Sequence, residues 1–375
     1  MPGFEVYDEQ ELNAVVEVFK EGGVLMAHGF AGSRSRYHVR ELERECADYF
    51  GVSFCQAVTS GTSALKIALK AVGVGPGDVV VTQAFNFIAT LEAIKDIGAI
   101  PKVINGDESL NMDAVELNKA IVEKKPKAVI CVNMLGVICD INKIKDICKK
   151  HSIPLIEDAC ESIGAKYNGK YSGALTDIGV FSFDHGKMIA AGEGGMILTN
   201  NEKYFRYCYE YHDHGHENNP KFPKGRDTRT IYGFNYRMTE LQGAIAKVQL
   251  NKLSSMLEEN EKRARHLINL KNRTILHRPI PESCMPTHDA VMVRANGQTL
   301  EKIKVLLHEL KFGTKNVPDA MEWHCAQYWD HILSPVEREN IKKTKLMLDE
   351  YVAIPISLKR TEAEYKNLAS RLEEI

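Results

Sequence analysis

The segment AVICVNMLGVICDINKIKDICKKHSIPLIED, residues 128–158, carries the pattern that decides the fold class. Residues 128–132 and 154–157 are short apolar runs of strand length, and residues 141–150 between them have the composition and length of a helix. Two apolar strands joined through a helix predict a parallel pair that is buried on both faces.

The same alternation continues outward from this segment. Further strands are expected at residues 79–82, 101–104, 180–183 and 195–199. Helices are expected to begin at Asp8, after Arg36 and at Ser60, and to cover residues 88–97 and 113–122. Strands that alternate with helices of about ten residues predict an α/β fold with a largely parallel central sheet flanked by helices.

The pattern changes after Met238, where a long helical stretch begins and ends in the charged run 258–265. Prolines, a helix at residues 299–311, an apolar run near residue 354 and a final helix follow. A chain of 375 residues exceeds the roughly 250–300 residues at which single cores stop growing. We therefore predict a large domain, residues 1–255, and a smaller C-terminal α+β domain, residues 256–375.

Composition excludes several classes of function. Lys plus Arg is 48 and Asp plus Glu is 50, so no broad basic field is available for nucleic acid or an anionic membrane. Apolar runs are too short to cross a bilayer, and residues 1–5 do not resemble a secretory signal. The nine cysteines are scattered without a C-x-x-C pair, which argues against a disulfide framework or zinc knuckle. We expect a cytoplasmic protein that has no nucleic-acid or membrane partner.

Three features follow predicted strands or open helices, where open α/β sheets bind ligands. Ser60, Gly61 and Thr62 open a helix and suit a phosphate, although such residues also serve simply as helix caps. Asp158 ends a strand, and Lys187 follows another, ahead of a glycine-rich segment. A phosphate cradle, a carboxylate and a lysine are the parts of a pyridoxal 5'-phosphate site, because the amine condenses with the aldehyde and the carboxylate keeps the ring nitrogen protonated.

Five ordered motifs make the resemblance specific. They are residues 59–65 (TSGTSAL), 86–90 (NFIAT), 156–161 (IEDACE), 181–195 (FSF with Lys187 and GEGG) and 233–238 (GFNYRM). Across its whole length the chain resembles the DegT/StrS family of pyridoxal-phosphate sugar aminotransferases. The resemblance implies the aspartate-aminotransferase-like fold of the fold type I enzymes, and a homodimer with active sites shared between subunits.

The resemblance also implies roles for individual residues. Lys187 matches the catalytic lysine that bonds the cofactor, and Asp158 matches the partner of the pyridine nitrogen. Phosphate contacts are implied for Ser60, Gly61, Thr62 and Ser182, and for Asn235 across the subunit boundary. Phe87 matches the aromatic residue that stacks on the ring, and Glu161 stands where the family often has Gln or His near the ring hydroxyl.

The lysine also bears on the reaction. Relatives that dehydrate sugars resemble this chain but have histidine in place of the lysine. Here Lys187 is present, and His185 lies two positions earlier. Transamination is therefore favoured over dehydration, with glutamate as the expected amino donor.

The substrate region is less regular. His212, His214 and His216 alternate in a polar segment, 211–219, which fits an irregular interface loop better than a metal site, so no metal is expected. This segment and Trp323-His324 resemble a subgroup that aminates the terminal aldehyde of an oxidised 3-deoxy-D-manno-octulosonate for lipopolysaccharide.

We expect substrate contacts from His185, His212, Arg237 and His324. Arg226, Arg229 and Lys224 would also suit an acidic sugar. The alternatives are a nucleotide-linked 4-keto or 3-keto-6-deoxysugar and, in a different class, a cofactor-binding regulator without turnover.

Overall fold

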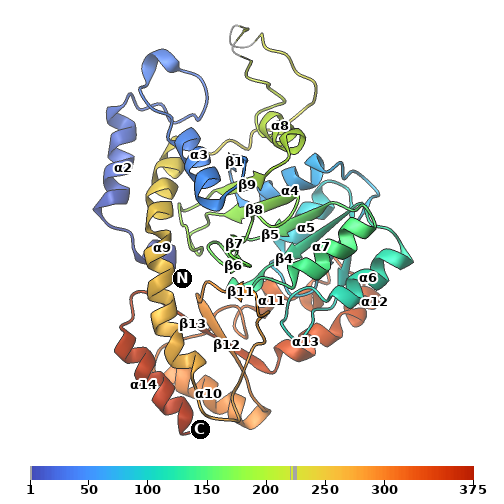
Figure 1. Cartoon of the computed structure of the whole chain (residues 1–375), viewed down its shortest axis with the longest axis vertical. Helices are drawn as coiled ribbons and strands as arrows, with labels where there is room; N and C mark the ends of the chain where they lie inside the picture. The colour runs from blue at the N-terminus through green and yellow to red at the C-terminus, as the bar shows by residue number, and fades with distance from the viewer. Residues whose placement is uncertain (1, 220, 223–225) are drawn as a thin grey trace.

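A seven-stranded sheet forms the centre of the larger part of the chain (Figure 1). The structure, a computed structural model, describes residues 2–219, 221–222 and 226–375. The strand order is β1-β9-β8-β5-β4-β2-β3, in which the run from β8 to β3 is parallel and β9 is antiparallel to both neighbours. Its strands are β1 (Phe54–Val58), β2 (Val79–Gln83), β3 (Ile100–Ile104), β4 (Ala128–Val132), β5 (Leu155–Asp158), β8 (Ile178–Ser182) and β9 (Gly195–Thr199).

Side chains alternate between two buried faces of this sheet. In β4, Ile130 and Val132 contribute to the core under α4, α5 and α8, whereas Val129 and Cys131 contribute to the core under α6 and α7. The helices are α4 (Gly61–Ala71), α5 (Ala89–Asp96), α6 (Ala114–Glu123), α7 (Ile141–Lys150) and α8 (Glu202–Tyr211). Burial on both faces explains the uninterrupted apolar strands and confirms the predicted α/β class.

A second, antiparallel sheet lies toward the C-terminus. Its order is β10-β12-β13, and its core is shared with α10, α14 and the end of α9. These elements are α9 (Glu240–Ile268), β10 (Leu276–His277), β12 (Ala290–Arg294), α10 (Gly297–Glu309), β13 (Tyr351–Pro355) and α14 (Glu362–Glu373). The division that we place at residue 255 falls inside α9, a continuous helix of 29 residues that packs on both cores.

The remaining elements are short or lie at the edges. A three-stranded sheet has the order β11-β6-β7, and helix α3 packs on α9. These elements are α1 (Pro2–Glu5), α2 (Glu9–Lys20), η1 (Ala31–Ser33), α3 (His38–Phe50), η2 (Met134–Gly136), β6 (Lys166–Tyr167), β7 (Lys170–Tyr171), β11 (Cys284–Met285), α11 (Met321–His324), η3 (Ala326–Tyr328), α12 (Pro335–Asn340) and α13 (Lys342–Leu348).

Helix starts and strand ends follow the sequence patterns closely. Asp8 and Glu11 form the predicted capping box of α2, and Gly51 ends α3 with a φ of 71°. The pattern did not predict β1, α8 or the β6–β7 hairpin. No helix in the described part of the chain is long and apolar enough to span a membrane.

Candidate active site

Helix α4 begins beside the carboxyl end of strand β8. Ser60 Oγ accepts a hydrogen bond from Ser63 N (3.1 Å) and Ser63 Oγ accepts one from Ser60 N (2.9 Å), so the two serines form a capping box. A Cβ atom on Gly61 would lie 2.8 Å from Ser182 Cβ, which explains why this position needs glycine. The first N–H groups of a helix have no partner within the helix, and this helix start therefore suits an anion.

Two adjacent carboxylates at the end of β5 have different surroundings. Glu157 accepts hydrogen bonds from Asn133 Nδ2 (2.8 Å) and Ser172 Oγ (2.9 Å) on one side of the sheet. Asp158 accepts from Thr90 Oγ1 (3.2 Å) and Cys160 N (3.2 Å) and lines a cavity. Burial raises the pKa of Asp158 in spite of these bonds and the more distant charge of Lys187. A cation beside Asp158 would offset the free-energy cost of keeping this buried carboxylate ionised.

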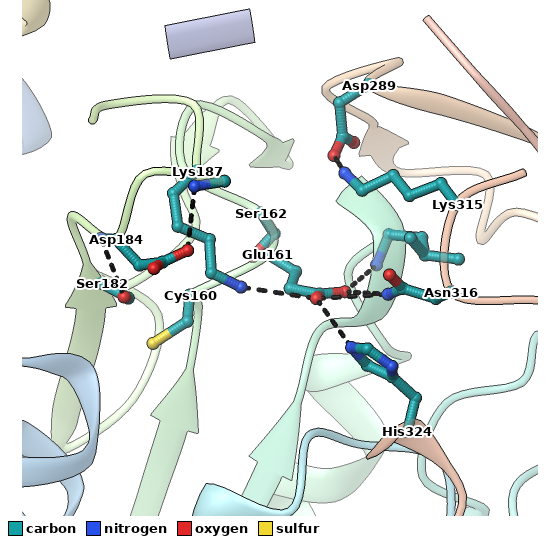
Figure 2. Close-up of polar contacts among 12 residues, drawn as sticks. Cys160, Glu161, Ser162, Ser182, Asp184, Lys187, Asp289, Lys315, Asn316 and His324 are labelled. Carbon is teal, nitrogen blue, oxygen red and sulfur yellow. Dashed lines mark hydrogen bonds and ion pairs between the residues drawn. The ribbon is translucent and has the colours of Figure 1, made fainter. Parts of the chain in front are cut away.

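Lys187 lies in the loop after β8, and its ammonium group contacts Glu161. Lys187 Nζ is 3.4 Å from Glu161 Oε1 (Figure 2). Burial acts to lower the pKa of Lys187, but nearby carboxylates, with Glu161 the strongest of them, outweigh burial and raise it. The lysine is therefore held as a cation by the residues around it.

Side chains from the C-terminal part of the chain also contact the Glu161 carboxylate. Asn316 Nδ2 donates to both of its carboxylate oxygens, at 3.3 and 3.2 Å, and His324 Nε2 lies 3.8 Å from Oε1 (Figure 2). Lys315, whose ammonium pairs with Asp289, contributes a further positive charge. Burial alone would raise the pKa of Glu161, but Lys187, His324 and Lys315 together lower it to about 2. Glu161 is thus an ionised carboxylate between two parts of the molecule.

These groups surround a cavity of about 420 Å³. Nine of the residues that the sequence predicts for the site line it: Ser60, Gly61, Thr62, Phe87, Asp158, Glu161, Ser182, Lys187 and His324. Residues from four of the five motifs therefore meet at one cavity, and motif 233–238 contributes none to its lining.

Other predicted residues lie elsewhere in the same chain. His212 is buried beside His28, with 3.1 Å between the two Nε2 atoms, and Arg237 pairs with Asp213. His185 stacks on Phe4 with ring centroids 4.2 Å apart. Protein groups contact the side chains of His185, His212 and Arg237, and none of the three lines the cavity of its own chain, so their expected substrate contacts stay predictions.

Asn235 and the basic loop also lie outside the cavity lining. Asn235 is exposed, and its Oδ1 accepts from Arg237 N. Arg226 and Arg229 do not line the cavity, and Lys224 lies outside the described residues. His216 contacts Asp227 at 3.0 Å in the same region. The cations that suggested an acidic sugar are therefore absent from the described cavity lining.

Sequence reasoning missed several cavity residues, including Thr90, Asp184, Asp289, Lys315 and Asn316. Thr90 belongs to the motif 86–90, so its place after a strand was a usable signal. Asp289, Lys315 and Asn316 lie about 50 to 80 residues beyond the last motif, 233–238, in segments without a recognisable pattern. Only tertiary packing brings them to Glu161.

Comparison with proteins of known structure defines the class of fold. The structure of 3-amino-5-hydroxybenzoic acid synthase superposes with a TM-score of 0.84 and 24% sequence identity, covering 98% of this chain and 96% of that one. This likeness confirms the expected fold of the type I aminotransferases.

Sequence comparison then gives the family. The DegT/DnrJ/EryC1/StrS aminotransferase family matches residues 7–373, and the chain belongs to it. GDP-perosamine synthase of Caulobacter vibrioides is 39% identical over 223 residues, 59% of this chain and 58% of the relative. A pleiotropic regulatory protein of Geobacillus stearothermophilus is 38% identical over 229 residues, 60% of this chain and 59% of the relative. The matched region thus spans less than two thirds of each of these curated relatives.

The cavity fits the cofactor that the family implies. Asp158 is a buried carboxylate whose hydrogen-bond donors, Thr90 and Cys160, are neutral, so a protonated pyridine nitrogen would supply the missing cation. The start of α4 suits the phosphate, and the ammonium of Lys187 faces the same cavity. The residues present therefore supply groups of the right chemistry for pyridoxal 5'-phosphate.

Proposed function

We propose that this chain is a pyridoxal-phosphate-dependent aminotransferase that moves an amino group from glutamate to the carbonyl carbon of a sugar. The observation that carries this proposal is the convergence of Lys187, Asp158 and the start of α4 on one cavity. A lysine, a buried acid and a phosphate site are needed together for this chemistry and have no common purpose in a purely structural role.

Each of these residues has a separate task in the proposal. Pyridoxal phosphate, when bound, supplies an aldehyde and a ring that draws electrons from the bonds next to the amino nitrogen. Lys187 Nζ would hold the cofactor covalently and, when free, would move a proton to or from the substrate carbon that carries the amino group. Asp158 holds the proton on the ring nitrogen. The N–H groups at Gly61 and Thr62, with the Ser182 hydroxyl, bind the phosphate, and Phe87 covers the ring.

Glu161 sets the charge of the lysine in this proposal. Its carboxylate is close to Lys187 Nζ and is fixed from the other side by Asn316 and Leu135 N, the latter at 3.3 Å from Oε2. Lys187 must lose a proton before it can attack an aldehyde. Because Glu161 raises the pKa of Lys187, it makes this loss of a proton less favourable in the free protein.

For the acceptor, we propose a nucleotide-linked keto sugar as the first candidate. GDP-perosamine synthase, whose name specifies a nucleotide-linked amino sugar, is among the similar sequences. The free eight-carbon sugar acid remains a second candidate because Lys315 and His324 line the cavity and could face a carboxylate. Glutamate carries carboxylates too, so these two groups serve either acceptor equally well.

We propose a homodimer in which Asn235 completes the site of the partner subunit. Its exposed position outside its own cavity supports this arrangement. Mixed dimers of inactive Asn235→Ala and inactive Lys187→Ala chains should then recover part of the activity, because one site in each carries both intact residues. Absence of recovery after proven subunit exchange would place the complete site within one chain.

A regulator without turnover is the competing function, and the likeness to a pleiotropic regulatory protein is the observation that favours it. The deciding experiment is an absorbance spectrum of the cofactor-loaded protein during addition of glutamate. The proposal predicts that the yellow colour bleaches and that one equivalent of 2-oxoglutarate forms per site. A spectrum unchanged by glutamate, with no 2-oxoglutarate, would support the regulator.

A further inference from the structure

Three aromatic rings form a continuous group at the edge of the cavity. Phe87 and His324 line the cavity, with ring centroids 5.4 Å apart. Trp323 stacks on Phe87, with centroids 6.4 Å apart and an interplanar angle of 22°. Trp323 is not itself among the lining residues, so it continues the aromatic surface beyond the cavity.

Two rings of this group, Trp323 and Phe87, are open to solvent although they are large and apolar, whereas His324 is buried. Trp323 is 58% exposed and Phe87 is 41% exposed, whereas Trp329 is 1% exposed. Covering a tryptophan ring is energetically favourable. An exposed tryptophan beside a cavity therefore indicates a place where a ligand could cover the ring. The two tryptophans thus differ sharply, one in a core and one at the edge of the site.

The backbone holds the group rigidly. Asn86 N donates to His324 O and Ile88 N donates to Trp323 O, both at 3.1 Å, so the loop that carries Phe87 is joined to α11. Trp329 Nε1 donates to Glu322 O at 2.8 Å, and this bond holds α11 against the buried Trp329. A rigid aromatic surface loses little conformational entropy when a ligand covers it.

We propose that the exposed face of Trp323, with Phe87 stacked behind it, is a platform for a flat ring face of the amino acceptor, which makes Trp323 a specificity-determining residue. This inference rests on the proposed function, because it assumes that an acceptor enters the cavity beside Lys187. The ring is either the base of a nucleotide-linked sugar or the ring of a free sugar. In both cases the platform offers an apolar face outside the cavity, with the reacting carbon directed inward.

The two tryptophans provide a direct test, because Trp329→Phe leaves Trp323 as the only emitter. The cofactor-loaded variant is titrated with GDP, with UDP and with 3-deoxy-D-manno-octulosonate, and acrylamide quenching of Trp323 is measured at each concentration. We expect one of these probes to lower the quenching constant about twofold or more as its ring covers the indole. If Trp329→Phe does not fold, the difference between wild type and Trp323→Phe gives the same signal.

The affinity of the same probe gives the second readout. Trp323→Ala should raise its Kd about tenfold, the size of loss found for removal of a stacked aromatic ring, and Trp323→Phe should restore most of the affinity. Val122→Ala, at an exposed apolar position on α6 away from the cavity lining, is the control and should leave the Kd unchanged. Protection by GDP or UDP identifies a base as the ring, and protection by the free acid identifies the sugar.

Two results would contradict the proposal that Trp323 stacks on the acceptor. The first is an unchanged quenching constant with all three probes, or an unchanged Kd in Trp323→Ala. The second is protection of Trp323 without any probe that disappears when the protein is diluted, since a second copy of the chain would then cover the ring. Bleaching by glutamate in the wild type separates either failure from failure of the aminotransferase proposal.

Discussion

Two buried polar regions of this molecule contain many of the predicted functional residues, yet they differ in how their charges are satisfied. In the cavity, Asp158 has neutral donors and Lys187 has a carboxylate at 3.4 Å. In the second region, which we name the histidine cluster (His28, Gln56, His212, Asp213 and Arg237), the side chains bond mainly to one another.

The charged groups and both imidazole rings of the histidine cluster are paired within the protein, whereas Gln56 Oε1 is buried without a hydrogen-bond partner. Arg237 pairs directly with Asp213, and His212 contacts His28, Gln56 Nε2 at 3.2 Å and Tyr209 O. Burial lowers the pKa of His28 to about 3 and that of His212 to about 4, so both rings are neutral near pH 7. A satisfied network stabilises a fold, whereas an unsatisfied one beside a cavity is a place for a ligand.

The largest predicted effect is at Lys187. Lys187→Ala should lower kcat by about 10³-fold or more, because both the covalent bond and the proton carrier are lost. The cofactor should still bind, but without a covalent bond. Stopped-flow transamination with glutamate measures the rate, and Lys247→Ala, a half-buried lysine paired with Glu41, is the control. Turnover within tenfold of wild type would remove Lys187 from the mechanism.

The next effect separates Asp158 from its neighbour. Asp158→Asn should slow proton transfer from glutamate by about 10²-fold or more, because an amide cannot keep the ring nitrogen charged. Glu157→Gln, on the opposite side of the strand, should lower the free energy of unfolding but retain the rate. Near-normal single-turnover rates in Asp158→Asn would contradict the assignment, as would an equal slowing in both variants.

A smaller effect is expected at Glu161. Glu161→Gln should lower the pKa of Lys187, because the strongest opposing carboxylate is removed while burial remains. Capture of pyridoxal phosphate by the free protein should then reach half its maximal rate at a pH lower by about one unit. The colour change with time measures this rate, and Glu193→Gln, which also lines the cavity, is the control. An unshifted pH profile would show that Glu161 does not set the charge of Lys187.

The smallest effect on the site is expected from the histidine cluster. His212 is neutral when folded and takes up a proton on unfolding, so stability should fall as the pH falls from about 6.5 toward the folded-state pKa of about 4. His212→Gln should reduce this loss by on the order of 1 kcal/mol and leave cofactor affinity unchanged. Urea unfolding at several pH values measures it, with the exposed His331→Gln as control. Weaker cofactor binding in His212→Gln would contradict this account and indicate that His212 takes part in the site.

The comparison also shows which parts of the site could be predicted. Residues near a strand end or helix start, such as Asp158, Lys187 and Gly61, are positioned by local structure, and the sequence pattern locates them. Lys315 and Asn316 follow α10 in a segment without such a pattern, and packing against the larger part of the chain places them. His212 and Arg237 have the chemistry of ligand-binding residues, but their neighbours, invisible in the sequence, already satisfy them. Composition can therefore suggest binding residues without showing whether their bonds are already taken.

The most direct test of the central claim is borohydride reduction of the loaded protein, followed by digestion and mass spectrometry of the labelled peptide. Our account predicts one reduced pyridoxyl group per chain, on Lys187, and loss of this label when glutamate is added before the reductant. Label on another lysine, or a yellow protein that gives no covalent label, would contradict it.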